Sequence, residues 1–333
     1  MTEKISNRKK ISIETDISKC LKCITQDYST KTDKLQEPDY VAALCLCLPQ
    51  KLKNILCASF KNYAFSVTGV FCHQKPFAKF DSKKCEIGDL LFVYFYDDIN
   101  GNISCNSLLL QAKVLNGKNI SLSSLGDKHQ FNLYSKWPEF TYSSAGILNG
   151  KTRDITPKTY GHGAKYMSIN PNSVFDKSNK NIYETAHANN DLCFNSSLSL
   201  NLIDLINFEK GEPIDYRPKE ISKIDDYSWT KDEWSMLIWD IINITRYSKF
   251  NRKNIGLFDF CRNTIADKNL LYYSHCPDDV FESELSKDFL NNNHEYSVIT
   301  DEYVGLPMMI IESKKLEEKE QKYYQYDKVE ILK

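Results

Sequence analysis

The sequence lacks any run of apolar residues long enough to cross a membrane, and residues 1–16 are mostly polar and contain no apolar run. A membrane-spanning helix needs about 20 consecutive apolar residues, and a secretory signal needs an apolar segment close to the N-terminus. We therefore expect no transmembrane helix, no membrane partner and no export.

Cysteine is too scarce for a disulfide scaffold, since the chain has 11 cysteines among its 333 residues. An odd number of cysteines without an export signal is typical of reduced thiols in a cytoplasm, so we predict a cytoplasmic protein. Cys20 and Cys23 have the spacing of half a zinc site. The second pair that a zinc site needs is missing at matching spacing, which leaves zinc as a minor alternative.

An excess of one charge is also absent, because 43 Lys and Arg residues stand against 44 Asp and Glu residues. This neutrality argues against a protein that simply coats nucleic acid. The charges are nevertheless unevenly distributed: residues 1–150 hold 19 basic and 14 acidic residues, and residues 151–333 hold 24 and 30. A mildly basic first half permits a phosphate-bearing partner.

Apolar material for a folded core is present, with 41% hydrophobic and 12% aromatic residues, and this excludes wholesale disorder. The length fits one large domain or two ordinary ones. We predict a polar N-terminal arm over residues 1–36, with a helix near residues 17–24, and then a core over residues 37–145. Residues 146–333 are expected to form a C-terminal recognition, regulatory or oligomerisation region of mixed, partly helical structure.

The core begins with an apolar segment, residues 39–60, whose spacing predicts a helix that Pro49 should break or restart. After it come three runs of β-branched and aromatic residues that predict strands, at residues 64–72, 89–96 and 107–114. Strands that are apolar on both faces belong in the middle of a covered sheet. We therefore expect an antiparallel meander over residues 64–122 with helices packed against it, in an α/β or α+β fold.

Two motifs in the second half have plain interpretations. Residues 230–233, Thr-Lys-Asp-Glu, match a capping box and predict a helix that begins at Thr230. Residues 161–165, Gly-His-Gly-Ala-Lys, resemble a phosphate loop only superficially, because they lack its spacing and its strand–helix context. We interpret this segment as a turn.

Three polar residues in two neighbouring predicted strands indicate a catalytic site. Asp89 begins a hydrophobic strand, and Gln111 and Lys113 lie in the next one. Side chains alternate along a strand, so Gln111 and Lys113 project from the same face. A buried ammonium is unfavourable without a partner, and Asp89 on the adjacent strand is the natural candidate for that partner.

In these residues, the chain resembles the PD-(D/E)xK nucleases, and most of all their Q-x-K variants, which are similar to Mrr-like restriction enzymes. The resemblance covers about residues 37–140 and follows the family's order: a helix, a strand, a strand that opens with Asp89, a strand with Gln111 and Lys113, and a helix over residues 127–137. It implies a restriction-endonuclease-like central mixed sheet flanked by helices. Gly88 stands where the family often has proline, and Gln111 is neutral where many members have an acid.

The resemblance implies a metal-dependent DNA endonuclease of restriction or phage-defence type, with RNA not excluded as a substrate. Asp89, the side-chain oxygen of Gln111 and the backbone carbonyl of Ala112 would hold Mg²⁺ or Mn²⁺, cations that take oxygen ligands. One further acid would complete the site, and the candidates are Glu37, Asp39 and Glu86. Lys113 would orient the attacking water and offset the growing charge on the phosphate. Cutting both strands of a duplex calls for a homodimer or a higher homo-oligomer.

Two other classes remain open. The first is a non-catalytic binding or structural subunit of a defence or nucleic-acid complex, built on the same sheet. The second is an enzyme whose site lies in the second half of the chain.

Overall fold

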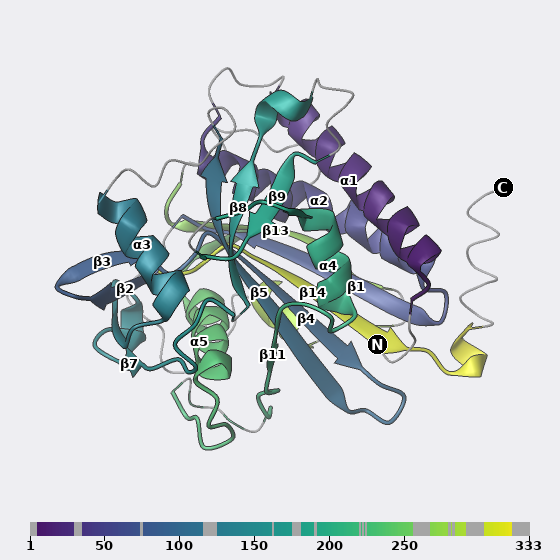
Figure 1. Ribbon diagram of the computed structural model, residues 1–333. Helices are drawn as coiled ribbons and strands as arrows, with labels where there is room; N and C mark the ends of the chain where they lie inside the picture. Colours follow the sequence, from purple (N-terminus) through teal and green to yellow (C-terminus); the bar gives the residue numbers. More distant parts are fainter. Residues whose placement is uncertain are drawn as a thin grey trace.

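The computed structural model describes residues 5–29, 35–73, 76–115, 125–161, 163–174, 181–189, 192–219, 221, 223, 225–255, 267–278, 281, 284–290 and 303–321. These residues form a mixed α/β fold in which helices cover both faces of a large mixed sheet (Figure 1). The general fold class predicted from the sequence is confirmed. The specific restriction-endonuclease-like arrangement stays a prediction.

The helices are α1 (Asn7–Ser29), α2 (Glu37–Ser59), α3 (Leu125–Lys136), α4 (Leu198–Ile206), α5 (Glu233–Tyr247) and α6 (Glu284–Leu290). The large sheet contains β1 (Tyr63–Phe71), β4 (Leu90–Asp97), β5 (Ile103–Val114), β8 (Ala164–Ile169), β9 (Tyr183–Ala186), β10 (Ser196–Ser197), β11 (Glu212–Ile214), β12 (Asn251–Asn254), β13 (Leu270–Cys276) and β14 (Met308–Lys315). A smaller sheet contains β2 (Phe77–Phe80), β3 (Lys83–Glu86), β6 (Phe140–Ser143) and β7 (Thr152–Arg153).

The strand order of the large sheet is β10-β9-β8-β5-β4-β14-β1-β13-β12, and β11 pairs with the beginning of β5. Strands β4 and β5 form an antiparallel pair, and β8 lies parallel to β5 after a connection that contains α3. The predicted simple meander is wrong, because β14 lies between β1 and β4. Its residues 308–313 are all buried, so the strand needs cover on both faces. Residues 116–122 of the predicted meander lie outside the described residues.

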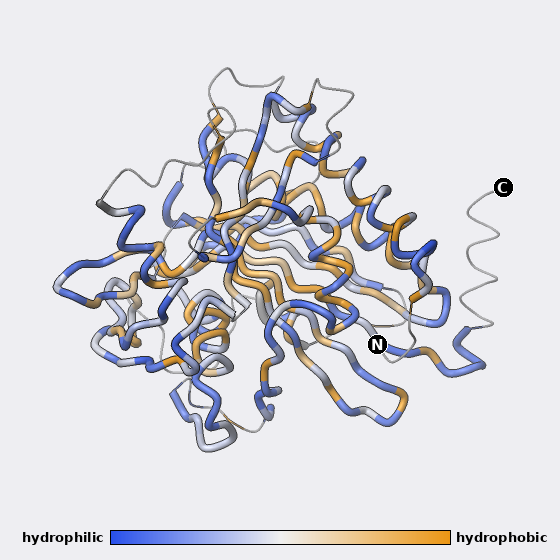
Figure 2. Tube along the Cα trace, viewed as in Figure 1, coloured by the Kyte–Doolittle hydropathy of each residue, from blue (hydrophilic) through white to orange (hydrophobic). Residues whose placement is uncertain are grey.

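The apolar side chains form two cores, one on each face of the sheet. One core packs α1, α2 and α4 against the sheet, and the other packs α3 and α5 against the opposite face. Figure 2 shows the hydrophobic segments converging on the middle strands. Strands from both halves of the chain share this sheet, so the boundary predicted near residue 145 does not separate two sheets.

The helix predicted near residues 17–24 of the polar arm is part of the much longer helix α1, which takes up residues 7–29. Ile13, Ile17, Leu21, Ile24 and Tyr28 recur every three or four residues and are buried. This spacing places them on one side of a helix, where they join the core that contains α2 and α4. Most of the polar residues between them face outward, which is why the composition resembled that of an arm.

Helix α2 continues through Pro49 without a break, which contradicts the predicted interruption. A proline inside a helix removes the hydrogen bond to the carbonyl four residues earlier, here that of Cys45. This carbonyl oxygen approaches Gly69 of β1 so closely that a Cβ built on Gly69 would lie 1.6 Å from it. The glycine therefore makes room for the helix to pack on the sheet. By length and composition α2 could also cross a membrane, but most of it is buried within the fold, as is typical of a core helix.

Helix α5 begins later than the predicted capping box at Thr230. Its N-cap is Asp232, whose Oδ2 accepts a hydrogen bond from the backbone N–H of Ser235 at 2.8 Å. The hydroxyl of Thr230 accepts from the N–H of Asp232 at 3.0 Å. An aspartate caps a helix at least as well as a threonine does, so Asp232 displaces the predicted cap.

Candidate functional site

The predicted site residues meet where β4 begins and β5 ends. Strands β4 and β5 are antiparallel, with Leu90 opposite Leu110, so the residue before β4 lies beside the last part of β5. The backbone N–H of Asp89 donates to the carbonyl of Leu110 at 2.8 Å. The pairing of the two strands therefore brings Asp89 and Gln111 together across 22 residues of sequence.

The carboxylate of Asp89 is buried and hydrogen-bonded. Its Oδ2 accepts from the side-chain Nε2 of Gln111 and, at 2.8 Å, from the backbone N–H of Ala112. Only 4% of Asp89 is exposed. A buried carboxylate requires such donors, and here they come from the Q-x-K strand itself.

Gln130 is a member of the site that the sequence analysis missed. From α3, its Nε2 donates to the side-chain oxygen of Gln111 and, at 3.2 Å, to the backbone carbonyl of Glu86. It thereby links α3 to Glu86 at the end of β3 and to Gln111 in β5. Asp127 and Gln130 are three residues apart, so they lie on one face of α3. This spacing is the signal that could have identified Gln130.

Lys113 pairs with carboxylates other than the predicted Asp89. Its Nζ lies 3.2 Å from Oδ1 of Asp127 and 3.9 Å from Oε2 of Glu37. Glu37 also accepts from the backbone N–H of Val114 at 3.1 Å. The prediction that Asp89 would be the partner is wrong because the donors of Gln111 and Ala112 occupy its Oδ2, while α2 and α3 each bring an acid to the end of β5.

The three candidate acids have different surroundings. Asp39 belongs to a capping box, since its side chain accepts from the backbone N–H of Gln36 at 2.7 Å. Glu37 is engaged with Lys113 and β5. Glu86, at the end of β3, lines the same cavity as Asp89.

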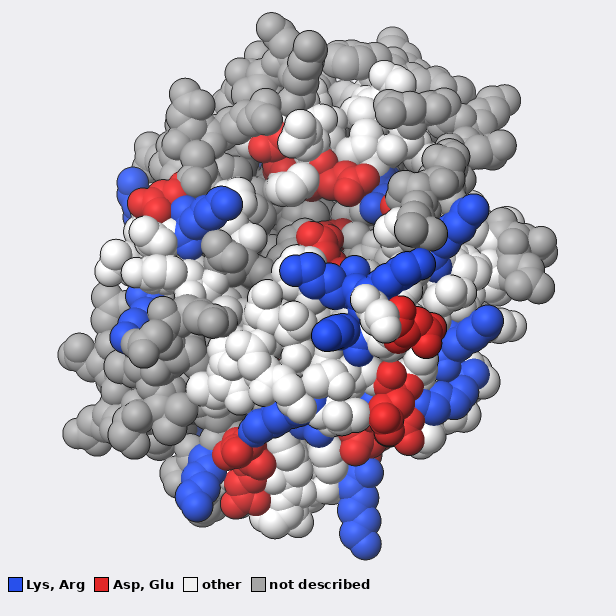
Figure 3. All heavy atoms as spheres, turned by 90° about the vertical axis from the view of Figure 1, so that its left-hand side faces the viewer, with Lys and Arg blue, Asp and Glu red and all other residues white. Residues whose placement is uncertain are grey.

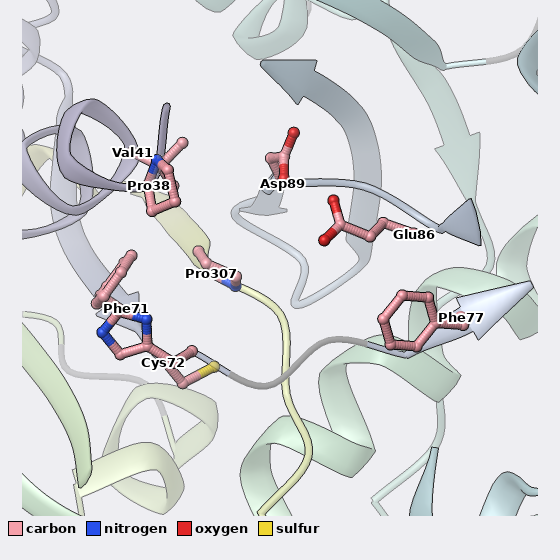
Figure 4. Close-up of a pocket in the computed structure, with 9 residues that line it drawn as sticks. Pro38, Val41, Phe71, Cys72, Phe77, Glu86, Asp89 and Pro307 are labelled. Atoms are coloured by element: carbon pink, nitrogen blue, oxygen red, sulfur yellow. The ribbon is translucent and has the colours of Figure 1, made fainter. Parts of the chain in front are cut away.

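This cavity has a volume of about 240 Å³ and combines polar and apolar walls. Figure 4 shows Asp89 and Glu86 beside each other on one side of the cavity, with Phe71, Phe77 and Pro307 around the remaining wall. His73 also lines the cavity. Two carboxylates and an imidazole therefore border one small space at the edge of the site.

The wall of the site also contains a buried tyrosine. Burial, followed by the negative charge of Asp89, raises the pKa of the Tyr134 phenol well above its usual value. The hydroxyl therefore stays protonated and donates to the carbonyl of Ile87 at 2.8 Å. This hydrogen bond fixes α3 against the segment between Glu86 and Asp89.

Exposed basic side chains lie on α3 and on the β2–β3 hairpin, next to the candidate site. Figure 3 shows the face that carries α3 and the β2–β3 hairpin, where blue side chains border acidic ones. The exposed lysines of these elements are Lys79, Lys83, Lys84, Lys128 and Lys136. Phe77 and Glu86 form the base of the hairpin and line the cavity. The hairpin lysines are therefore only a few residues in sequence from residues that line the candidate site.

The donor set suits a hard cation. Asp89 and Glu86 supply carboxylates and Gln111 supplies an amide, and such oxygen ligands are those that Mg²⁺ prefers. Within the part of the chain that the structure describes, no three His, Cys, Asp or Glu side chains cluster as metal ligands. That finding gives the zinc alternative no support among these residues. A cation here would rely on an amide or a backbone carbonyl as its third ligand.

Comparisons with known proteins return no match: no family model, no curated protein and no solved structure is similar to this chain. The resemblance to the PD-(D/E)xK nucleases therefore stays a prediction that rests on Asp89, Gln111 and Lys113.

Proposed function

We propose that this protein is a metal-dependent endonuclease that hydrolyses DNA phosphodiester bonds, of restriction or phage-defence type. The observation that supports this function best is the contact between Asp89 and Gln111 across the β4–β5 pair. Lys113 lies two residues further on the same face of β5, and Glu86 shares a cavity with Asp89. These are the residue types that metal-assisted phosphodiester hydrolysis requires.

Each residue has a role in this proposal. Asp89, Glu86, the side-chain oxygen of Gln111 and the carbonyl of Ala112 would hold Mg²⁺ or Mn²⁺. The bound cation would polarise the scissile phosphate and lower the pKa of a water molecule. Lys113, held at the end of β5 by Asp127 and Glu37, would orient this water and offset negative charge as it develops.

Gln111 must change its hydrogen bonds for this role. Its amide nitrogen faces Asp89 and its amide oxygen faces Gln130. A cation needs the oxygen, so the amide has to turn over. A glutamine can both donate and accept, and therefore Gln130 can turn with it and preserve the contact between the two amides.

The exposed lysines of the β2–β3 hairpin and α3 support DNA as the substrate. Lysines that neutralise backbone phosphates make binding weaker as the salt concentration rises. Cleavage of both strands by one site per chain calls for a homodimer or larger assembly. Elution at the mass of a monomer, with and without DNA, would contradict this expectation.

The deciding experiment is cleavage of supercoiled plasmid by the full chain with Mg²⁺, Mn²⁺ or EDTA, alongside a labelled RNA. The variants are Asp89→Asn and Lys113→Met, and Lys151→Met serves as the control because Lys151 pairs with Asp225 and does not line the cavity of the site. We expect metal-dependent cleavage that both site variants lose and the control keeps. Cleavage that persists in a folded Asp89→Asn variant would place the catalytic site elsewhere in the chain.

A second candidate is a non-catalytic binding or structural subunit. It is favoured by the contacts that these residues make within the protein, since Asp89 accepts two hydrogen bonds and Lys113 pairs with two carboxylates. Such a satisfied network also occurs as a purely structural element. This candidate predicts no divalent-cation binding by calorimetry, and it predicts that Lys113→Met alters stability alone.

A further inference from the structure

A second cavity, of about 300 Å³, lies at the beginning of β8 and is lined by Lys165, Thr185, His187, Ser196 and Lys210 together with glycines. It is separate from the candidate nuclease site. Lys165 pairs in register with Leu110 of the parallel strand β5, and Gln111 pairs with Tyr166. Because successive side chains alternate, Lys165 and Gln111 project from opposite faces of the sheet.

Lys165 is the unusual residue of this cavity. Only 5% of it is exposed, and its Nζ donates to Oδ1 of Asn201 at 2.7 Å. No carboxylate of the described residues forms an ion pair with it, and its hydrogen-bond partner is the neutral amide of Asn201. Burial, followed by the charge of Lys210, lowers its pKa to about 8. A buried ammonium without a counter-ion is unfavourable, and an anion in the cavity would remove this cost.

Asn201 holds the ammonium in a defined place. Its Nδ2 donates to Oγ1 of Thr185 at 2.9 Å, to Oγ of Ser196 at 2.8 Å and to the carbonyl of Ser197 at 2.7 Å. These donations fix the orientation of the amide, so its oxygen faces Lys165. The position of Lys165 is therefore set by a network that reaches from α4 to β9 and β10.

Further donors border the same space. Lys210 lies 2.8 Å from Asp204 and donates to Oγ of Ser196 at 3.4 Å. The hydroxyl of Ser196 thus accepts from both Asn201 and Lys210. Among the described residues no acceptor receives its own hydrogen, so this hydroxyl can donate to a ligand in the cavity.

The positive charge is only partly compensated. Asp204 is shared, since Lys10 lies 2.5 Å from its other oxygen and Lys210 lies 2.8 Å away. Glu209 also contacts Lys10 at 2.5 Å. Of the two lysines that line the cavity, Lys210 therefore has an ion pair with Asp204, whereas Lys165 has none with the described carboxylates.

Two glycines allow the walls to approach each other. A Cβ on Gly163 would lie 2.8 Å from the carbonyl oxygen of Ser107, and one on Gly211 would lie 2.7 Å from the same atom. Gly211 also has a φ of +89°, a conformation that glycine adopts readily. The two segments that contain these glycines therefore pack on the same point of β5 and form one side of the cavity.

We propose that this cavity binds a small phosphate-bearing anion, either inorganic phosphate or a phosphate monoester such as a nucleoside monophosphate. Ammonium and hydroxyl donors converge on it from β8, β10 and the segment after α4, which matches a group with several charged oxygens. Its volume lies at the lower end of the range for small-molecule sites. The turn predicted at residues 161–165 thus ends in a ligand-binding lysine, although Lys165 lies in a strand and not in a phosphate loop. His162 of this segment lies outside the described residues.

The test is calorimetric titration of the full chain with phosphate, sulfate and adenosine monophosphate, in EDTA and without DNA. Under these conditions the result is independent of the proposed nuclease activity. We expect binding that Lys165→Met weakens about tenfold or more, since it removes a charge-assisted hydrogen bond. Lys210→Gln should weaken binding several-fold, and Lys151→Met, with the same loss of charge, should leave it unchanged.

Adenosine monophosphate that binds more tightly than phosphate would identify a monoester as the ligand, and equal or weaker binding would identify the free ion. Absence of binding by all three anions would overturn the proposal. Equal affinities of the wild type, Lys165→Met and Lys210→Gln would overturn it as well. Methionine matches the length of the buried lysine stem, and Lys210, which is only partly buried, provides a second variant that is expected to fold.

Discussion

Gln130 of α3 donates a hydrogen bond to the side chain of Gln111 on β5, and Gln111 in turn donates to Asp89. The helix therefore positions the carboxylate through an intermediate amide. Gln130 also contacts the carbonyl of Glu86, so one side chain connects the two acids that border the cavity. Any chemistry assigned to Asp89 depends on this helix being in place.

Replacement of Gln130 by alanine should leave the amide oxygen of Gln111 buried without its donor. An unsatisfied buried group costs about 1–3 kcal/mol, and we expect the free energy of unfolding to fall by about that amount. Denaturation in urea measures it. Gln50→Ala is a suitable control, because Gln50 is exposed and donates only to Asn54 within α2. Equal stability of the two variants would show that Gln130 does not hold the network.

Gly69→Ala should be far more disruptive than its small size suggests. The new Cβ would fall 1.6 Å from the carbonyl oxygen of Cys45 and 2.9 Å from the ring of Pro49, so helix and strand would have to separate. We expect a loss of about 3 kcal/mol or more. In Gly161→Ala the nearest atom would be 3.3 Å away on a side chain. Thermal unfolding of both variants should show a large decrease in Tm for the first alone.

The sequence indicated the contact between Asp89 and Gln111 because both lie on strands that are neighbours along the chain, and a tight turn sets the register of such a pair. It did not indicate that β14 would lie between β1 and β4. Insertion of a distant strand depends on long-range packing, and local patterns carry no information about it. Lys165 was missed for a related reason, since its burial is created by α4, which lies more than 30 residues away in sequence.

Calorimetry of Mg²⁺ binding should distinguish Glu86 from Glu37 as the acid that completes the site with Asp89. We expect Asp89→Asn and Glu86→Gln each to weaken binding about tenfold or more, because each removes a charged ligand from the cavity. Glu37→Gln should have little effect on affinity, because Glu37 pairs with Lys113. A strong effect of Glu37→Gln together with no effect of Glu86→Gln would show that the acid that completes the site with Asp89 comes from α2. Absence of Mg²⁺ binding to the wild type would favour the non-catalytic candidate.

The second cavity should bind anions in a pH-dependent way. The folded-state pKa of Lys165 is about 8, below the usual value of 10.5, so between these values the unfolded chain binds the proton and the free folded protein does not. Raising the pH through this window therefore stabilises the free protein through this group. Anion binding favours the protonated ammonium and should take up a proton.

Sulfate affinity should consequently fall above about pH 8, approaching tenfold per pH unit. Sulfate keeps its charge between about pH 6 and 9, so the change reports on the protein. Lys210 and His187 line the same space, and Asp204 pairs with Lys210. Burial, followed by the charge of Lys165, lowers the pKa of His187 from its usual value, so the imidazole stays neutral above pH 8, where the affinity is expected to fall. Titrations at several pH values should show the decrease in the wild type and in Lys151→Met. A decrease of the same size in Lys165→Met would assign the pH dependence to another group.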